Sequence, residues 1–234
     1  MVALWLTVVV VVALVVWLVR SRPAAAPADQ PGGQVRLTGI PTGVTTPLAA
    51  LMGLSPVPVK QAPAFTFVDQ AGRTVSLSSF RGRSVVLEFM DPHCVDICPL
   101  VSQEFLNANR DLGPAAGHVV FLAINVNRYY SGVADVEAFS SAHQLTSLPS
   151  WHFLTGPVPA LAATWNAYGI AVSDRGRNAD VVHTNTLYFI DPQGREQFVA
   201  IPMADYTASG AAYLPTSDLV SWGKGIALVA QSMS

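Results

Sequence analysis

The apolar run Ser84–Met90 (SVVLEFM) constrains the fold of this chain most strongly. A run of this length, bounded by turn-forming residues, is typical of a central strand that is covered on both faces. A second run of the same kind, Val119–Val126, follows after a stretch at about 94–110 that we expect to be helical. Strands and helices continue to alternate along the chain, which predicts an α/β domain with a sheet between layers of helices.

Two β-hairpins are also expected, because each pairs two short apolar segments across a turn sequence that ends in glycine. The first joins 64–68 to 74–77 across Asp69-Gln70-Ala71-Gly72, and the second joins 186–190 to 196–200 across Asp191-Pro192-Gln193-Gly194. The other expected elements are a short strand at 151–154 and helices at 135–143, 158–168 and 216–231.

The first part of the chain differs in composition from the rest. The segment Val2–Val19 contains no charged residue and, as a helix of 18 residues, would be roughly 27 Å long, close to the thickness of a bilayer core. We therefore expect a transmembrane anchor at residues 1–19, in preference to a signal peptide cleaved near 24–28. Residues 20–61 are rich in Pro, Ala and Gly and are expected to form a linker to a folded domain at 62–234.

Two signals conflict on the side of the membrane where the domain lies. Arg20 and Arg22 directly follow the apolar segment, and the positive-inside rule would place the domain in the cytoplasm. The cysteine chemistry described below favours the other side, and we expect a single-pass protein of the cell membrane with its domain extracytoplasmic. The net charge is −2 and the sequence has no basic stripe with interleaved aromatic residues, so we expect no nucleic-acid partner.

The sequence contains two cysteines, Cys94 and Cys98, which follow the apolar run at the expected start of a helix. Functional sites of open α/β sheets form at this carboxyl edge of the strands, and a helix N-terminus favours thiolate over thiol. Residues four apart on a helix lie on one face, so the two sulfurs can form a disulfide or bind one metal ion. Thiolates suit Cu(I), and an added imidazole makes a site that also holds Cu(II).

Five histidines are candidates for a third ligand. His183 lies on the loop that enters the strand expected at 186–190, and the residues alone leave its role open. His93 adjoins Cys94, but neighbouring side chains point apart, so we expect His93 to shape the loop. The other three are expected to be surface histidines or hydrogen-bonded core histidines, namely His118, His143 and His152.

Two parts of the sequence carry a family resemblance. The stretch Ala62–Leu100 resembles the opening of redoxin domains. The Cys-x-x-x-Cys-Pro motif with Asp96 before its second cysteine, together with a His-Thr pair before a strand that ends in Ile-Asp-Pro-x-Gly, resembles the Sco/SenC family of copper chaperones. The likeness implies a thioredoxin-like fold, with a central mixed β-sheet flanked by helices, an N-terminal hairpin and a single preceding transmembrane helix.

The resemblance also implies a function. It assigns Cys94 and Cys98 as copper ligands and as a redox pair. It assigns His183 as the copper histidine, since the loop before that strand packs against the cysteine helix in thioredoxin-like domains. The family is membrane-anchored and extracytoplasmic, and it delivers copper to the dinuclear copper centre of cytochrome c oxidase or reduces the cysteines of that centre. The expected partner is a copper-receiving oxidase subunit or another thiol protein.

Two departures from the family pattern leave other functions open. Val95 replaces the proline commonly found after the first cysteine, and Asn125–Tyr130 lacks the family's Asp-Pro-rich segment. The main alternative is an extracytoplasmic thiol–disulfide oxidoreductase without obligatory copper. A peroxidase would need an arginine near the cysteine, whereas Arg81 and Arg83 are expected at the opposite end of the strand. A binding module is the expectation if the cysteines are unreactive.

Overall fold

The structure is a computed structural model and describes residues 38–179 and 181–234. The expected transmembrane anchor at 1–19 and the first part of the expected linker lie outside these residues. Within the described ranges, no helix is both long enough and apolar enough to cross a membrane.

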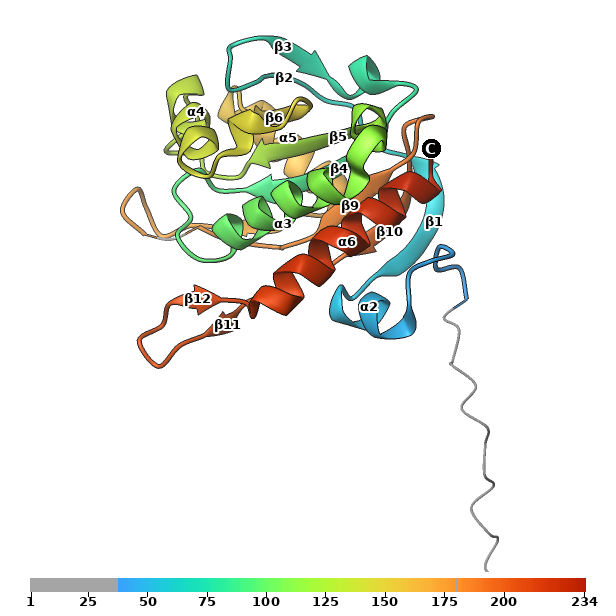
Figure 1. Cartoon of the computed structure of the whole chain (residues 1–234). Coiled ribbons are helices and arrows are strands. Elements are labelled where there is room, and N and C mark those ends of the chain that lie inside the picture. The colour runs from blue at the N-terminus through green and yellow to red at the C-terminus, as the bar shows by residue number, and fades with distance from the viewer. Residues whose placement is uncertain (1–37, 180) are drawn as a thin grey trace, which may run out of the picture. The chain divides into compact units, whose positions relative to one another are not determined.

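A six-stranded mixed sheet forms the centre of the domain (Figure 1). Its strands, in order across the sheet, are β1 (Ser55–Gln61), β10 (Arg195–Ala200), β9 (Leu187–Ile190), β4 (Ser84–Met90), β5 (Val119–Asn125) and β6 (Trp151–Leu154). Strands β4, β5 and β6 are parallel, whereas β9 is antiparallel to β4 and β10 is antiparallel to β9. The apolar run Ser84–Met90 is therefore a central strand, as the sequence predicts.

Helices cover both faces of this sheet, as Figure 1 shows. They are α2 (Thr46–Leu51), α3 (Ile97–Leu112), α4 (Val133–Ala142), α5 (Val158–Tyr168) and α6 (Thr216–Ser232). The side chains of β4 alternate between two cores: Val86 and Met90 pack in the core that contains α3 and α6, and Leu87 and Phe89 in the core that contains α5. The expected α/β architecture, a mixed sheet flanked by helices, is confirmed.

The two predicted hairpins are built on the same kind of turn. In the N-terminal hairpin, β2 (Thr66–Val68) pairs antiparallel with β3 (Thr74–Ser76), and Asp69 Oδ1 accepts hydrogen bonds from two backbone N–H groups of the turn, at 3.0 and 2.9 Å. In the turn between β9 and β10, Asp191 Oδ1 does the same, at 2.9 and 2.8 Å. An aspartate that accepts from the backbone two residues later stabilises such turns.

The N-terminal segment departs from the prediction. Residues 46–61, which the sequence analysis assigns to the linker, form α2 and the edge strand β1. The Thr45 hydroxyl caps α2 by accepting a backbone N–H at 3.4 Å, and Met52 after the helix is fully buried. Pro56 and Pro58 are tolerated in β1 because, among the described residues, it is an edge strand that pairs with β10 alone. The segment resembles a linker in sequence because the elements it packs against come from the end of the chain.

Two short hairpins that the sequence did not predict project on the side of the molecule where α3 begins (Figure 1). They are β7 (Val172–Ser173) with β8 (Val182–His183), and β11 (Asp205–Tyr206) with β12 (Ala212–Tyr213). The 3₁₀ helices are η1 (Leu77–Phe80), η2 (Gly113–His118) and η3 (Leu145–Ser147).

Helices α3 and α6 approach each other closely at Gly223. A β-carbon added at Gly223 would lie 2.9 Å from the backbone nitrogen of Ala108 and 3.0 Å from the carbonyl carbon of Asn107. The Asn107 side-chain amide also donates to the Leu219 carbonyl, at 3.1 Å. The missing side chain of Gly223 therefore allows the backbones of the two helices to pack directly against each other.

Replacing Gly223 with alanine is expected to destabilise the protein by about 2 kcal/mol. Overpacking costs about 1–3 kcal/mol or more, and against rigid backbone it exceeds the ~1 kcal/mol that alanine gains in helix propensity. Urea denaturation of the copper-free protein measures the change. Gly117→Ala is the matched control, since a β-carbon there meets no atom within 4 Å. Equal stabilities of the two variants would contradict the close helix packing.

Candidate metal centre

The loop that carries the cysteines begins where β4 ends, and Asp91 holds it in place. The buried Asp91 carboxylate accepts hydrogen bonds from the His93 N–H, at 2.8 Å, and from the side-chain amide of Asn127, at 2.9 Å. The Asp91 carbonyl accepts from the Cys94 N–H, at 3.1 Å. Because Asn127 follows β5, the neighbour of β4, the loop is anchored to the carboxyl edge of the sheet, as predicted.

The two cysteines approach each other, although not on one helical face. Helix α3 starts at Ile97, so Cys98 lies in its first turn and Cys94 lies in the preceding loop. The expectation that the helix begins at about Cys94 is therefore wrong. The loop nevertheless turns Cys94 toward the helix, and the Cys98 N–H donates to the Cys94 Sγ at 3.3 Å. Both cysteines are free thiols.

Asp96 connects Cys94 with the N-terminus of α3. Its Oδ1 accepts from the Ile97 N–H, at 2.6 Å, and from the Cys94 thiol, at 2.8 Å. Cys94 is half-buried, whereas Cys98 is only 2 % exposed. Cys94 is therefore the sulfur that a partner molecule can reach.

The surroundings of Cys98 disfavour its ionisation. The hydrogen bond with Cys94, burial, and the charge of a Cys94 thiolate raise the pKa of Cys98 well above its ordinary value. Cys98 is therefore the thiol that keeps its proton. It loses this proton only when its sulfur forms a bond to a metal ion or to another sulfur.

His183 lies on β8, in the short β7–β8 hairpin. Its Nδ1 donates to the Thr184 carbonyl, at 3.0 Å, because a carbonyl can only accept, and the neutral ring therefore keeps a lone pair on Nε2. Burial lowers the pKa of His183, and the Thr184 carbonyl and the negative charges of Asp91 and Asp96 oppose this shift. Because β9 is antiparallel to β4, β9 begins at the end of the sheet where the cysteine loop leaves β4, and His183 precedes β9 by four residues.

The three predicted metal ligands are only partly assembled. The structure brings Cys94 to Cys98, but in the part of the chain that it describes no three His, Cys, Asp or Glu side chains are grouped to hold a metal ion. Ligation by His183 requires its imidazole to come closer to the two sulfurs. The donor set fits copper, because it combines two soft thiols with an imidazole whose Nε2 is free. The assignment of Cys94, Cys98 and His183 as a metal site stays a prediction.

Among the described residues, three of the other four histidines contact side chains outside the cysteine pair. The His93 ring stacks on Tyr130, with ring centroids 3.6 Å apart, and its Nε2 lies 3.7 Å from Asp135 Oδ1 on α4. The remaining three are His143, which packs against Phe139, His152, which hydrogen bonds with Asp69 at 3.0 Å, and the exposed His118 at the end of η2.

Two buried glutamates lie on the two elements that flank the cysteine loop, and the sequence analysis did not identify them. Glu88 on β4 is 1 % exposed and Glu104 on α3 is 0 % exposed. One oxygen of Glu88 accepts from the Phe89 N–H, at 3.1 Å. The other oxygen, and both oxygens of Glu104, have no hydrogen-bond partner among the described residues. Burial raises the pKa of Glu88 to about 8 and that of Glu104 well above its ordinary value. A glutamate inside an apolar run was the signal available in the sequence.

The opposite end of the sheet offers no comparable chemistry among the described residues. Arg81 and Arg83 precede β4 at this end, as predicted, which separates them from the cysteines by the length of the strand.

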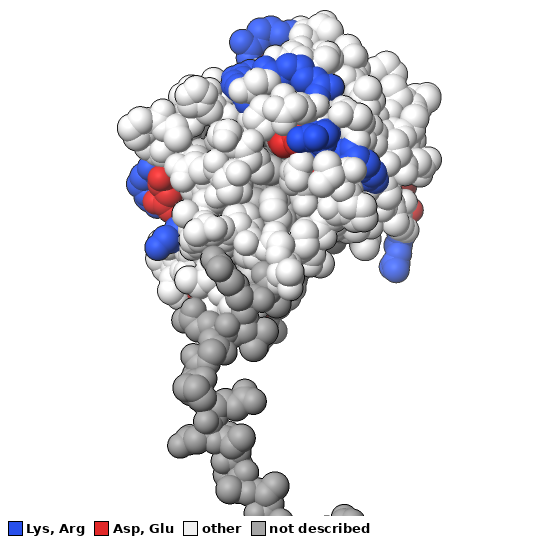
Figure 2. Space-filling view, turned by 90° about the vertical axis from the view of Figure 1, so that its right-hand side faces the viewer, with Lys and Arg blue, Asp and Glu red and all other residues white. Residues whose placement is uncertain are grey.

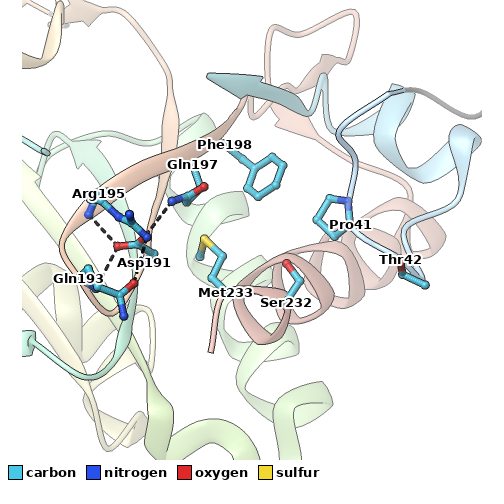
Figure 3. Close-up of a pocket in the computed structure, with 9 residues that line it drawn as sticks. All are labelled: Pro41, Thr42, Asp191, Gln193, Arg195, Gln197, Phe198, Ser232 and Met233. Carbon is cyan, nitrogen blue, oxygen red and sulfur yellow. Dashed lines mark hydrogen bonds and ion pairs between the residues drawn. The ribbon is translucent and has the colours of Figure 1, made fainter. Parts of the chain in front are cut away.

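The face of the molecule that carries β1 shows several Lys and Arg side chains but few Asp and Glu (Figure 2). A cavity of about 600 Å³ lies between the β9–β10 turn and the end of α6 (Figure 3). Its Asp191 carboxylate is already bound by Arg195 and Gln197, at 2.8 and 2.7 Å.

A smaller groove lies directly beside Cys94. Its volume is about 490 Å³, and it runs between the cysteine loop and α4. Imidazoles of His93 and His143 line it together with the Phe139 ring. A molecule that reacts with Cys94 therefore meets a partly apolar surface next to the sulfur.

The fold and the site define the class of this protein: a thioredoxin-like domain with a dithiol between a central strand and the following helix. The family is then shown by comparison. The SCO1/SenC family model matches residues 57–211, and the chain belongs to this family.

Individual relatives are similar over most of the folded domain. The SCO1 protein homolog of Bacillus subtilis is 24 % identical over 159 residues, which cover 67 % of this chain and 78 % of that protein. Copper-bound ScoI of Bradyrhizobium japonicum has a TM-score of 0.57 at 19 % identity, covering 75 % of this chain and 100 % of that one. BsSco is described as having a disulfide switch and as a member of the Sco family of cytochrome c oxidase assembly proteins. It has a TM-score of 0.51 at 22 % identity, and the match covers 74 % of this chain and 96 % of that one. The structural likenesses show a shared fold.

Proposed function

We propose that the protein is a copper-binding metallochaperone with a redox-active dithiol, and that it aids assembly of the dinuclear copper centre of cytochrome c oxidase. The observation that carries this proposal is the approach of Cys94 to Cys98 at the carboxyl edge of a SCO1/SenC domain. The relatives support it, because ScoI of B. japonicum has been solved with copper bound and BsSco is described as belonging to a family of oxidase assembly proteins.

Copper is the cargo in this proposal, and three side chains of the chain hold it. Cys94 and Cys98 bind as thiolates, and His183 binds through Nε2 because its Nδ1 donates to the Thr184 carbonyl. The lowered pKa of His183 supports this role, since only a neutral imidazole can act as a ligand. Copper leaves by ligand exchange with the acceptor, which begins at Cys94 because this sulfur is the more exposed of the two.

A thiol–disulfide oxidoreductase is the second candidate, and the difference in exposure between the cysteines favours it. The Cys94 thiolate attacks one sulfur of a partner disulfide and releases the other partner sulfur as a thiolate. The Cys98 thiol then passes its proton to the released partner thiolate as its sulfur attacks the Cys94 sulfur of the mixed disulfide, and the second partner sulfur leaves as a thiolate. The partner gains two electrons, and the chain ends with a Cys94–Cys98 disulfide.

We further propose that the domain acts on the extracytoplasmic side of the cell membrane, tethered by residues 1–19. The uncharged composition of Val2–Val19 supports the tether. A dithiol that cycles between thiol and disulfide suits a compartment in which disulfides persist. The partner is then a copper-receiving oxidase subunit or another thiol protein that reaches Cys94.

Replacing His183 with alanine is expected to weaken copper retention by more than about tenfold while both thiols stay titratable, because the imidazole ligand is lost and the sulfurs are kept. Copper content after dialysis against a chelator, together with thiol titration, measures the two quantities. His118→Ala is the matched control, since His118 is exposed and lies before β5, at the opposite end of the sheet.

The same variants separate the two candidate functions. Undiminished copper retention in His183→Ala would exclude His183 as a ligand. The oxidoreductase is favoured if the His183→Ala protein still reduces insulin disulfides at the unaltered rate. If neither the unaltered protein nor the variant turns over any protein disulfide, the oxidoreductase is excluded instead.

A further inference from the structure

A group of five side chains beside the candidate site has no part in the function described so far. We call it the Tyr–Arg cluster, and it consists of Arg128, Tyr129, Tyr130, Asp174 and Arg177. The first three residues lie in the loop between β5 and α4, and the last two lie in the loop of the β7–β8 hairpin. The cluster therefore joins two segments that are far apart in the sequence.

Every contact within the cluster crosses from the β5–α4 loop to the hairpin. The Tyr129 hydroxyl donates to Asp174 Oδ1, at 2.7 Å, and Arg128 Nε lies 3.0 Å from Asp174 Oδ2. The Arg177 guanidinium lies over both tyrosine rings, 5.8 Å from the Tyr129 centroid and 5.3 Å from the Tyr130 centroid. The Asp174 side chain is only 11 % exposed, so its ion pair is less screened by water than an ordinary surface pair.

The loop side of the cluster is fixed to the cysteine loop. The Tyr130 ring stacks on His93, which is part of that loop. The Tyr129 N–H donates to Asn127 Oδ1, at 2.9 Å, and the Asn127 amide donates to Asp91, at 2.9 Å. A continuous set of contacts therefore runs from the cysteine loop through the cluster to the hairpin.

The hairpin that carries Asp174 and Arg177 of the cluster also carries His183, on strand β8. The two hairpin strands pair over only two residues each, Val172–Ser173 with Val182–His183. One backbone hydrogen bond closes the base of the hairpin, from the Thr184 N–H to the Ala171 carbonyl at 3.0 Å. Because an isolated two-stranded hairpin is marginally stable at best, its orientation depends on contacts with the rest of the domain.

We propose that the Tyr–Arg cluster is a positioning element, which holds the β7–β8 hairpin in the orientation from which His183 reaches the two sulfurs. This role rests on the proposed copper function. Three of the five residues come from the segment Asn125–Tyr130, which begins at the last residue of β5, the strand beside β4. Without the cluster, the hairpin must be ordered when copper binds, and the loss of freedom lowers the affinity.

The test compares Arg177→Gln with Arg175→Gln in the full chain, solubilised in detergent. Both substitutions remove one positive charge from the same hairpin, but among the described residues only Arg177 lies over the two rings. Hydrogen exchange of the metal-free protein reports the mobility of residues 171–184, and competition with a Cu(I) chelator reports the affinity. We expect Arg177→Gln to speed exchange and to weaken copper binding about 10–100-fold, as loss of an outer-shell partner does. Arg175→Gln is expected to change neither.

A second pair of variants separates positioning from folding. Tyr130→Phe keeps a ring against both Arg177 and His93, and it is expected to preserve exchange and affinity. Tyr130→Leu removes the ring and is expected to speed hairpin exchange and weaken copper binding as Arg177→Gln does. The melting temperature of the protein is expected to stay unchanged.

Two results would overturn the positioning role. One is unchanged hairpin exchange in Arg177→Gln, and the other is faster exchange with unchanged copper affinity, because the cluster would then hold the hairpin without positioning His183. Failure of the copper function itself gives a different pattern: the unaltered protein binds no copper, and the positioning role falls with it, whatever the exchange rates show.

Discussion

Replacing Cys98 with serine is expected to lower the affinity for Cu(I) by more than about 100-fold, because loss of an outer-shell partner alone already costs 10–100-fold and a direct ligand contributes more. Serine has nearly the same shape as cysteine, but its hydroxyl is a hard donor that does not replace a thiolate toward copper. Competition with a Cu(I) chelator under reducing conditions measures the affinity.

Val95→Ser is the matched control for this substitution. Val95 lies between the two cysteines and is 86 % exposed, so the control adds a hydroxyl to the same loop and removes no ligand. A Cys98→Ala variant shows whether the buried hydroxyl itself does harm, and thermal melting separates loss of the ligand from loss of the fold. Copper binding by Cys98→Ser as tight as that of Val95→Ser would contradict the proposed site.

The same variant also reports on the dithiol chemistry. If Cys94 is the attacking sulfur, Cys98→Ser should accumulate a mixed disulfide with a partner, because no second thiol is present to release it. Cys94→Ser should accumulate none, since the remaining Cys98 sulfur is buried. Non-reducing electrophoresis of the two variants distinguishes these outcomes.

Replacing Glu88 with glutamine is expected to make the free energy of unfolding much less dependent on pH between about pH 5 and pH 8. The ordinary pKa of this carboxyl is 4.5, and burial raises it to about 8 in the folded protein. Between these values the folded state keeps a proton that the unfolded chain has lost, so raising the pH favours unfolding by about 1.4 kcal/mol per pH unit.

The direction of the Glu88 effect defines the pH window of the test. The stability that the neutral Glu88 carboxyl contributes is complete below about pH 4.5, is lost as the pH rises, and changes no further above about pH 8. From pH 5 to pH 7 the unaltered protein is expected to lose roughly 3 kcal/mol through this group. Urea denaturation of the reduced, copper-free protein at several pH values measures the slope.

Two further variants make this test specific. Glu104 contributes with the same sign, because burial and the charge of Glu88 raise its pKa, so the double variant Glu88→Gln/Glu104→Gln should show the flattest profile. Glu137→Gln, at an exposed position of α4, is the matched control. The change in the free energy of unfolding per pH unit is compared between variants. The absolute free energies are not, since burying a glutamine amide is itself destabilising. Equal slopes for Glu88→Gln and Glu137→Gln would contradict the prediction.

The regular elements of the two cores were predictable because their signals are local. Ser84–Met90, Trp151–Leu154 and Val158–Tyr168 have the predicted bounds. Each is a short stretch whose hydrophobic pattern and flanking turn residues suffice to choose between helix and strand. The two Asp-containing hairpin turns were predictable for the same reason, since an aspartate side chain forms its hydrogen bonds within the turn.

Elements whose stability depends on a distant partner were not predictable. Strand β1 has two prolines and an exposed face, and only the free edge of β10 makes it a strand. The β7–β8 hairpin pairs over two residues on each side, too few for a pattern in the sequence. The prediction that α3 begins at about Cys94 was wrong because the capping residue is Asp96, which follows Cys94 in the chain.

The sequence by itself determined the chemistry that is available to this protein: two thiols four residues apart after a buried strand, and a histidine before a later strand. Only the tertiary structure decided how these groups meet. It turned Cys94 toward α3 through a loop anchored by Asp91, buried Glu88 on β4 and Glu104 on α3, and joined the hairpin of His183 to the β5–α4 loop. The physical reason is that burial and orientation arise from contacts between segments that are distant in the chain, whereas strand and helix patterns arise between neighbours.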